Sequence, residues 1–209
     1  MRVLVLESQT PFVHGGAEIL SRELLGALRT RGYEADLVSI PFRDSPRDEL
    51  LAHAAAWRLI DLTRALDRSI DAVVATKFPT YFVRHPRKVT WLVHQHRAAY
   101  ELCGTPFSDF EHTEHDVGLR KRLIELDTQM LGECRGLFSI ARTVSARLEK
   151  YNRLTATPLY HPPRLAASIR AGAYGDYFLL VSRLEKVKRI DLAIKALAQA
   201  RGNARLVIA

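Results

Sequence analysis

Two adjacent glycines, Gly15 and Gly16, separate a short apolar run from an amphipathic helical pattern. Glycines at a strand-to-helix junction let backbone N–H groups approach an anion, and the positive end of the helix dipole adds to the attraction. The segment lacks the G-x-G-x-x-G pattern of a dinucleotide site and the Gly-Lys-Ser/Thr of a P-loop. A tight turn is the alternative interpretation, and the two glycines alone do not decide between a turn and an anion site.

A second group of polar residues follows an apolar run in the segment WLVHQHRAAY, residues 91–100. His94, His96 and Arg97 would lie at the carboxyl end of a strand, the edge at which open α/β sheets bind ligands. Lys77 follows an earlier apolar run in the same way. No carboxylate accompanies the two histidines at matching spacing, so no metal site is predicted. The alternative to a ligand cleft is a histidine with a structural hydrogen bond.

The third group lies in VSRLEKVKRIDLAI, residues 181–194. Arg183 ends an apolar run, and Lys188 stands five residues later, where a helical pattern begins. A guanidinium fork and an ammonium group beside a helix N-terminus suit a diphosphate. Two solvated surface cations are the alternative.

Strands that alternate with helices must position these residues. The apolar runs typical of buried strands cover residues 2–7, 34–40, 71–76, 88–93 and 136–141. Helical patterns cover residues 17–31, 47–67 and 114–135. This alternation predicts an α/β fold, with a doubly wound parallel sheet of the Rossmann-like kind.

The pattern changes near Pro158, where TPLYHPPRL contains a proline pair that neither a helix nor a central strand tolerates. We predict a first domain over residues 1–163 and a linker over 164–176. Residues 177–209 then read as strand 177–183, helix 189–202 and strand 204–209, the opening of a second Rossmann-like domain. Two parallel strands are not a stable domain by themselves, so the chain is predicted to stop inside this second domain.

Composition limits the classes of protein that remain. The chain has 209 residues and 47% hydrophobic content, which excludes a disordered protein. Its net charge of +8 suits an anionic ligand, a nucleic acid or an acidic membrane, although arginines on solvated helix faces would also explain it. Two cysteines, Cys103 and Cys134, are too few for a disulfide scaffold and fit a reducing compartment. No apolar stretch approaches the ~18 residues of a membrane span.

A segment rich in acids and histidines, SDFEHTEHD, covers residues 108–116. Such a group could hold a metal ion, but these residues form a polar loop that leads into a helical pattern. We therefore predict a solvated helix cap at this position and no metal site.

Together these segments resemble the family 4 glycosyltransferases, which have the GT-B fold. HGGAE matches the Gly-Gly loop that follows the first strand in that family, and His94 matches a histidine after a mid-domain strand. SRLEKVKRIDLAI is similar to the family's GRLxxxKG and the helix after it. It keeps Arg183 and Lys188, but has Ser182 and Arg189 in place of the two glycines. YHPP is similar to the family's interdomain joint.

The resemblance implies a retaining glycosyltransferase that moves a sugar from a nucleotide-diphosphate sugar to an acceptor, without a bound metal or other cofactor. His94 would face the donor sugar, while Gly15, Gly16, Arg183 and Lys188 would bind the donor diphosphate. The acceptor would be a glycan, a lipid-linked molecule or a small molecule. It would lie near Lys77, His96, Arg97 and Tyr100.

The family's remaining hallmark is a pair of glutamates in the second domain, which we expect beyond Ala209. The chain alone is therefore expected to be inactive. A cytoplasmic location is predicted, with attachment to the inner face of the membrane left open. Two other classes stay open: a nucleotide-binding module without catalysis, and a basic nucleic-acid-binding domain. The sequence lacks the interleaved aromatic and basic residues of single-strand binders, so nucleic acid is not a predicted partner.

Overall fold

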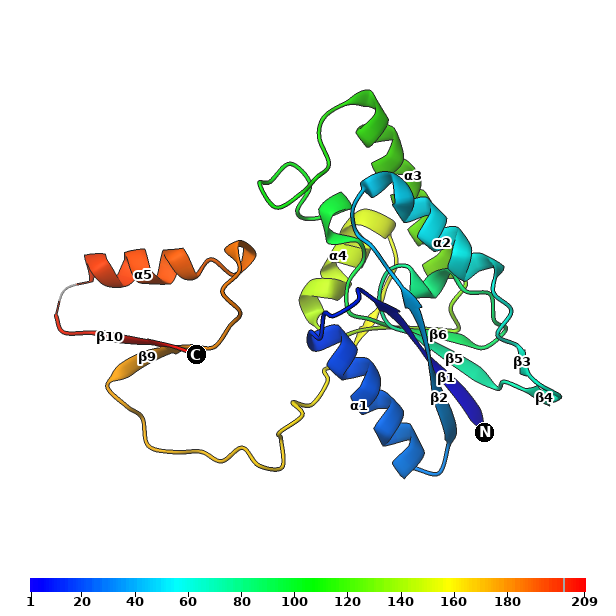
Figure 1. Cartoon of the computed structure of the whole chain (residues 1–209), viewed down its shortest axis with the longest axis horizontal. Coiled ribbons are helices and arrows are strands. Elements are labelled where there is room, and N and C mark those ends of the chain that lie inside the picture. Colours follow the sequence, from blue (N-terminus) through cyan, green and yellow to red (C-terminus); the bar gives the residue numbers. More distant parts are fainter. Residues whose placement is uncertain (201) are drawn as a thin grey trace. The chain divides into compact units, whose positions relative to one another are not determined.

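A computed structural model describes residues 1–200 and 202–209 of the chain (Figure 1). The chain divides into two compact units, Met1–Arg164 and Leu165–Ala209. Each unit is described by itself below.

A six-stranded sheet forms the centre of the first unit, with strand order β2-β1-β5-β6-β7-β8. Every pairing in this sheet is parallel. The strands are β1 (Arg2–Gln9), β2 (Glu34–Pro41), β5 (Ala72–Ala75), β6 (Lys88–Leu92), β7 (Gly136–Ser139) and β8 (Thr157–Pro158). The prediction of an α/β fold with a parallel sheet is confirmed. The short strand β8 ends in Pro158 and lies at the edge of the sheet, where a proline is tolerated.

The order of the strands changes direction at β1. From β1 the chain first adds β2 on one side, and then crosses back to add β5 and the later strands on the other side. The boundary between β1 and β5 is therefore the topological switch point of the sheet, and ligands of open α/β sheets bind at the carboxyl ends of the strands there.

Helices cover the sheet. They are α1 (Gly16–Thr30), α2 (Leu50–Leu59), α3 (Glu114–Gly132) and α4 (Arg142–Asn152). Short 3₁₀ turns are η1 (Arg47–Glu49), η2 (Thr80–Phe82) and η3 (Arg97–Ala99). In Figure 1, α1 runs beside β1 and β2. The main apolar core joins the sheet to the other helices, with Leu6 of β1, Trp57 of α2, Leu123 of α3 and Leu148 of α4 all buried in it.

The prediction of one long helix over residues 47–67 is wrong. The helix α2 ends at Leu59, and Ile60 already has an extended backbone. The carboxylate of Asp61 accepts hydrogen bonds from the backbone N–H and the hydroxyl of Thr63, at 2.8 and 2.7 Å. This local turn competes with helix formation. The residues after it form a small antiparallel hairpin, β3 (Arg64–Ala65) and β4 (Arg68–Ser69), in place of two further helical turns.

The second unit is a strand–helix–strand. Strands β9 (Tyr177–Leu180) and β10 (Arg205–Ile208) pair in parallel, and the turn η4 (Lys186–Lys188) leads into helix α5 (Ile190–Gln199). The predicted helix range reached residue 202, and Arg201 within it lies outside the described residues. Phe178 and Leu179, which point to opposite faces of β9, are both exposed. The two-stranded sheet thus leaves apolar side chains uncovered on both faces.

Candidate functional site

The loops that follow β1, β5 and β6 are held together at the carboxyl edge of the sheet. The hydroxyl of Ser8 donates to the carbonyl of Phe78 at 2.9 Å, and the hydroxyl of Thr76 donates to the carbonyl of Leu6 at 2.9 Å. The backbone N–H of Val93 donates to the carbonyl of Thr76 at 2.7 Å. Side chains on these three loops are therefore fixed relative to one another, at the switch point of the sheet.

The two glycines open helix α1 but differ in what surrounds them. Gly15 is the N-cap, and its N–H donates to Oε2 of Glu18 at 2.9 Å, as in a capping box. Gly16 is the first residue of α1 and is exposed, its φ is not positive, and a Cβ added to it would meet no atom within 4 Å. Neither backbone conformation nor packing within the described residues requires a glycine at position 16. A ligand that approaches the backbone there would require one.

Lys77, predicted near the acceptor, forms an ion pair with Glu18 in the first turn of α1. Its ammonium group lies 2.6 Å from Oε1 of Glu18, and both side chains are largely buried. Burial raises the pKa of Glu18, but the hydrogen bond and the charge of Lys77 outweigh it, so the pKa is lowered overall. Lys77 therefore fixes the end of β5 to the start of α1 and holds the glycine loop in place.

Glu7 was not predicted as a site residue, although it visibly breaks the first apolar run. It is fully buried near the end of β1, and neither carboxylate oxygen has a hydrogen-bond partner within the described part of the chain. Burial raises its pKa, and the nearby negative charge of Glu18 adds to this, while Arg22 and Lys77 oppose it. Glu7 is therefore a buried carboxyl group with a raised pKa, near the charged residues Glu18 and Arg22 of α1.

His94 follows β6 at the same edge and is partly buried. Its Nδ1 lies 2.7 Å from the carbonyl oxygen of Gln95, and because a carbonyl only accepts, Nδ1 carries the hydrogen. Burial, together with the charges of three nearby cations, lowers the pKa of His94 to about 4, although the hydrogen bond to Gln95 opposes the shift. At neutral pH the ring is therefore uncharged. Its Nε2 makes no hydrogen bond with any described residue, so it offers a lone pair to a ligand.

The cations that act on His94 are Lys77, Arg97 and Arg147. Arg147 was missed in the sequence because it belongs to α4, which had not been assigned as an element. A signal exists: Arg147 stands between Val144 and Leu148, two buried residues of an amphipathic helix, so a charged group there faces inward. Both Arg97 and Arg147 contact Glu101.

His96 and Tyr100, predicted near the acceptor, have inward-facing surroundings. The ring of His96 lies between those of Phe78 and Phe110, with centroid distances of 5.7 and 6.2 Å, and its Nε2 is buried. Tyr100 is buried, and its hydroxyl donates to Oδ2 of Asp127 at 2.6 Å. The edge of the sheet therefore brings Gly16, Lys77, His94 and Arg97 together, while His96 and Tyr100 support it from within.

A buried polar network lies directly behind His94. The side-chain amide of Gln95 donates to Oδ1 of Asn152 at 3.1 Å, and the amide of Asn152 donates to the hydroxyl of Tyr100 at 3.3 Å. The network ends at Asp127, which is fully buried and whose pKa burial raises to about 7. This network ties the segment that carries His94 to helices α3 and α4.

The raised pKa of Asp127 predicts a pH-dependent stability. Between about pH 4 and pH 7 the folded protein keeps a proton on Asp127 that the unfolded chain has released. The unfolding free energy should therefore fall as pH rises through this window and then level off. Asp127→Asn keeps the shape without the charge, so it should lose a smaller part of its stability between pH 5 and pH 8. Urea unfolding of both proteins at the two pH values measures the difference, and equal losses would contradict this assignment.

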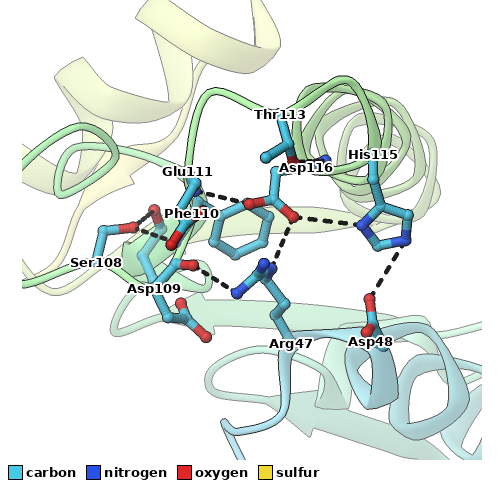
Figure 2. A network of polar contacts seen from close by, with 10 residues as sticks. Arg47, Asp48, Ser108, Asp109, Phe110, Glu111, Thr113, His115 and Asp116 are labelled. Atoms are coloured by element: carbon cyan, nitrogen blue, oxygen red, sulfur yellow. Dashed lines mark hydrogen bonds and ion pairs between the residues drawn. The ribbon is translucent and has the colours of Figure 1, made fainter.

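The loop that follows η3 is anchored by an arginine from a distant segment (Figure 2). Arg47 donates from Nε to Oδ1 of Asp116 and from a terminal nitrogen to the carbonyl of Asp109, both at 2.7 Å. Asp116 also accepts from the N–H of Glu111 at 2.7 Å. Thr113 caps α3, as predicted for a helix-capping segment, but Asp116 is fully buried and not solvated. The described residues hold no group of three histidine, cysteine or acidic side chains able to bind a metal ion.

In the second unit, Arg183 and Lys188 lie in the segment between β9 and α5. Arg183 lies 2.8 Å from a carboxylate oxygen of Glu185, and Lys188 is exposed at the end of η4. Arg189 follows as the N-cap of α5, with φ +53. The two predicted phosphate-binding cations are thus close in sequence and exposed to solvent. Lys188 forms no ion pair with any described residue.

A pocket of about 490 Å³ lies at the opposite edge of the sheet, lined by residues that precede β6, among them Arg84 and His85. It is remote from the carboxyl ends of the strands, where the polar groups above converge.

No family model matches the chain, and no curated protein matches it. None of the helices within residues 1–200 and 202–209 is long and apolar enough to cross a membrane.

Proposed function

We propose that this chain belongs to a glycosyltransferase of the GT-B type, which transfers a sugar from a nucleotide-diphosphate sugar to an acceptor. The observation that carries the proposal is the neutral His94 at the carboxyl end of β6, whose Nε2 has no hydrogen-bond partner among the described residues. An uncharged imidazole can accept a hydrogen bond from a sugar hydroxyl without adding charge to the site. Retention of configuration rests on the sequence resemblance.

The backbone at Arg189 supports the same proposal. The resembled motif has a glycine at this position, and Arg189 adopts φ +53, in the left-handed region that glycine occupies most readily. The departure from the motif therefore keeps the conformation that the glycine would provide. Arg183 and Lys188, the residues of the motif that persist, are our proposed ligands of the donor diphosphate.

In this proposal each group has a distinct part. Negative charge develops on the departing diphosphate, and Arg183 and Lys188 would stabilise it. His94 would orient the donor sugar. Lys77 and Glu18 would hold the glycine loop in position, a role that the 2.6 Å ion pair supports. The proposed setting is the cytoplasm, with a glycan, a lipid-linked molecule or a small molecule as acceptor.

Replacement of Lys188 by alanine is expected to weaken nucleoside diphosphate binding about ten- to hundredfold. A hydrogen bond from a charged donor to phosphate contributes roughly 1.5–3 kcal/mol, whereas a solvated cation contributes little. Arg183→Lys should not preserve the affinity, since an ammonium group lacks the planar fork of arginine. Calorimetric titration of the chain with UDP and with GDP provides the measurement.

Lys195→Ala is the matched control, because Lys195 is an exposed cation on the same helix. It should bind the nucleoside diphosphate as the wild type does. Equal affinities for the wild type, Lys188→Ala and Lys195→Ala would mean that Lys188 does not bind the donor and that the proposed donor site is wrong. Binding that depends on Lys188, without sugar transfer by a chain extended beyond Ala209, would favour a nucleotide-binding module over an enzyme.

A further inference from the structure

Two arginines share one carboxylate oxygen beside His94. Nε of Arg97 contacts Oε1 of Glu101, and a terminal nitrogen of Arg147 lies 3.0 Å from the same oxygen. The other oxygen, Oε2, is buried and has no hydrogen-bond partner among the described residues. One negative charge thus faces two positive charges, and the pair of cations is only half neutralised.

The other charged groups near His94 do not neutralise the surplus positive charge of the two arginines. Lys77 also acts on His94, but Glu18 neutralises it at 2.6 Å. His94 itself is uncharged at neutral pH, so it neither adds to nor cancels the surplus. One positive charge therefore remains near His94, at the edge of the sheet where ligands of open α/β folds bind.

The two arginines also have hydrogen-bond donors that no described residue accepts from. Arg97 uses Nε and Arg147 one terminal nitrogen, so each retains nitrogen atoms without a partner in the described chain. The Arg147 side chain is 17% exposed and fixed within α4, while that of Arg97 is 43% exposed. One held guanidinium and one accessible guanidinium form a site that a tetrahedral, doubly charged group can bridge.

We propose that Arg97 and Arg147 bind a phosphoryl group of the acceptor, next to His94, and that the acceptor is accordingly a phosphorylated molecule. That the bound molecule is an acceptor rests on the proposed function. That the site binds a phosphoryl group rests on the two arginines alone. Glu101 orients both guanidinium groups and is the internal anion with which the ligand competes.

The test is an NMR titration of the 209-residue chain with methyl phosphate at constant ionic strength, with glycerol as the uncharged comparison. Arg147→Gln should weaken methyl phosphate binding about tenfold or more, in line with the loss of one charge-assisted hydrogen bond. Arg97→Gln should act in the same direction, and because Arg97 is more exposed it serves where Arg147→Gln fails to fold. Lys150→Gln removes an exposed charge from the same helix and should leave the affinity unchanged.

Glu101→Gln gives a test of opposite sign. The amide keeps the size of the side chain but removes the competing negative charge, so methyl phosphate should bind several-fold more tightly than to the wild type. If Arg97, Arg147 and Glu101 had a purely structural role, this change would not increase the affinity for methyl phosphate. Unchanged or weaker binding in Glu101→Gln, or equal affinities in Arg147→Gln and Lys150→Gln, would overturn the proposal.

A second titration with UDP identifies the source of the phosphoryl group. If Arg147→Gln weakens UDP binding and leaves methyl phosphate binding intact, the arginines serve the donor and the proposal for the acceptor is wrong. If methyl phosphate binding depends on Arg147 while Lys188→Ala leaves the affinities for UDP and GDP unchanged, the phosphoryl site stands and the proposed donor site of the glycosyltransferase fails. The two failures are therefore distinguishable.

Discussion

Replacement of His94 by alanine is expected to lower sugar-transfer turnover about hundredfold or more and to leave the melting temperature almost unchanged. The loss of one well-placed polar group at a reaction centre has this scale. His94 offers Nε2 to a ligand, and its one hydrogen bond within the described chain is a local one, to the carbonyl of the next residue. Turnover with nucleotide sugars, measured for a chain extended beyond Ala209, and thermal unfolding of the same proteins provide the two readouts.

His96→Ala is the control for this substitution, because His96 lies two residues away and packs between two phenylalanine rings. It should lower the melting temperature by more than His94→Ala does. Because the pKa of His94 is about 4, its neutral form persists far below neutral pH, so the His94 contribution should be lost only as pH falls toward 4. Unchanged turnover with a reduced melting temperature in His94→Ala would make His94 a structural residue.

The arrangement of the carboxyl edge could be predicted because it depends on short-range patterns. Apolar runs predict buried parallel strands, and the fold class then places every residue that follows a strand at one edge. His94 and Lys77 were found in this way. The pattern says nothing of which side chains meet there. Lys77 pairs with Glu18, which is 59 residues away in sequence, and the pattern of apolar runs does not predict that partner.

The end of α2 and the orientation of Tyr100 could not be predicted from the sequence pattern, for a different reason. The helical spacing of residues 47–67 continues past Leu59, but the helix ends there. The carboxylate of Asp61 accepts a hydrogen bond from the backbone N–H of Thr63, and this local turn competes with further helix. Tyr100 follows a strand as His94 does, yet its side chain turns inward to Asp127 on α3. Local hydrogen bonds in the first case and helix packing in the second decide the outcome, and neither leaves a periodic signal.

The two ends of strand β6 carry different polar residues. His94 follows its carboxyl end, and Lys88 begins it at the opposite edge of the sheet. The Lys88 side chain is 1% exposed, and its ammonium group donates to the carbonyls of Tyr81 and Met130 at 2.8 and 2.9 Å. Its third donor reaches Glu133 at 3.2 Å. Burial lowers the pKa of Lys88, while Cys134 and Glu133 oppose that shift. All three donors are thus used within the protein.

Lys88→Met is therefore expected to reduce the unfolding free energy by about 3 kcal/mol, since each buried carbonyl left without a donor costs roughly 1–3 kcal/mol. Methionine fills a similar volume, so the loss reports the hydrogen bonds rather than a cavity. Arg58→Met is the control: Arg58 binds Glu133 at 2.7 and 2.8 Å but is more exposed, and it should cost less. Urea unfolding provides both values. Since Lys88 lies at the far end of β6, folded Lys88→Met protein should keep the methyl phosphate affinity of the wild type. A loss no larger than that of Arg58→Met would mean that the ammonium group is not what stabilises this edge of the sheet.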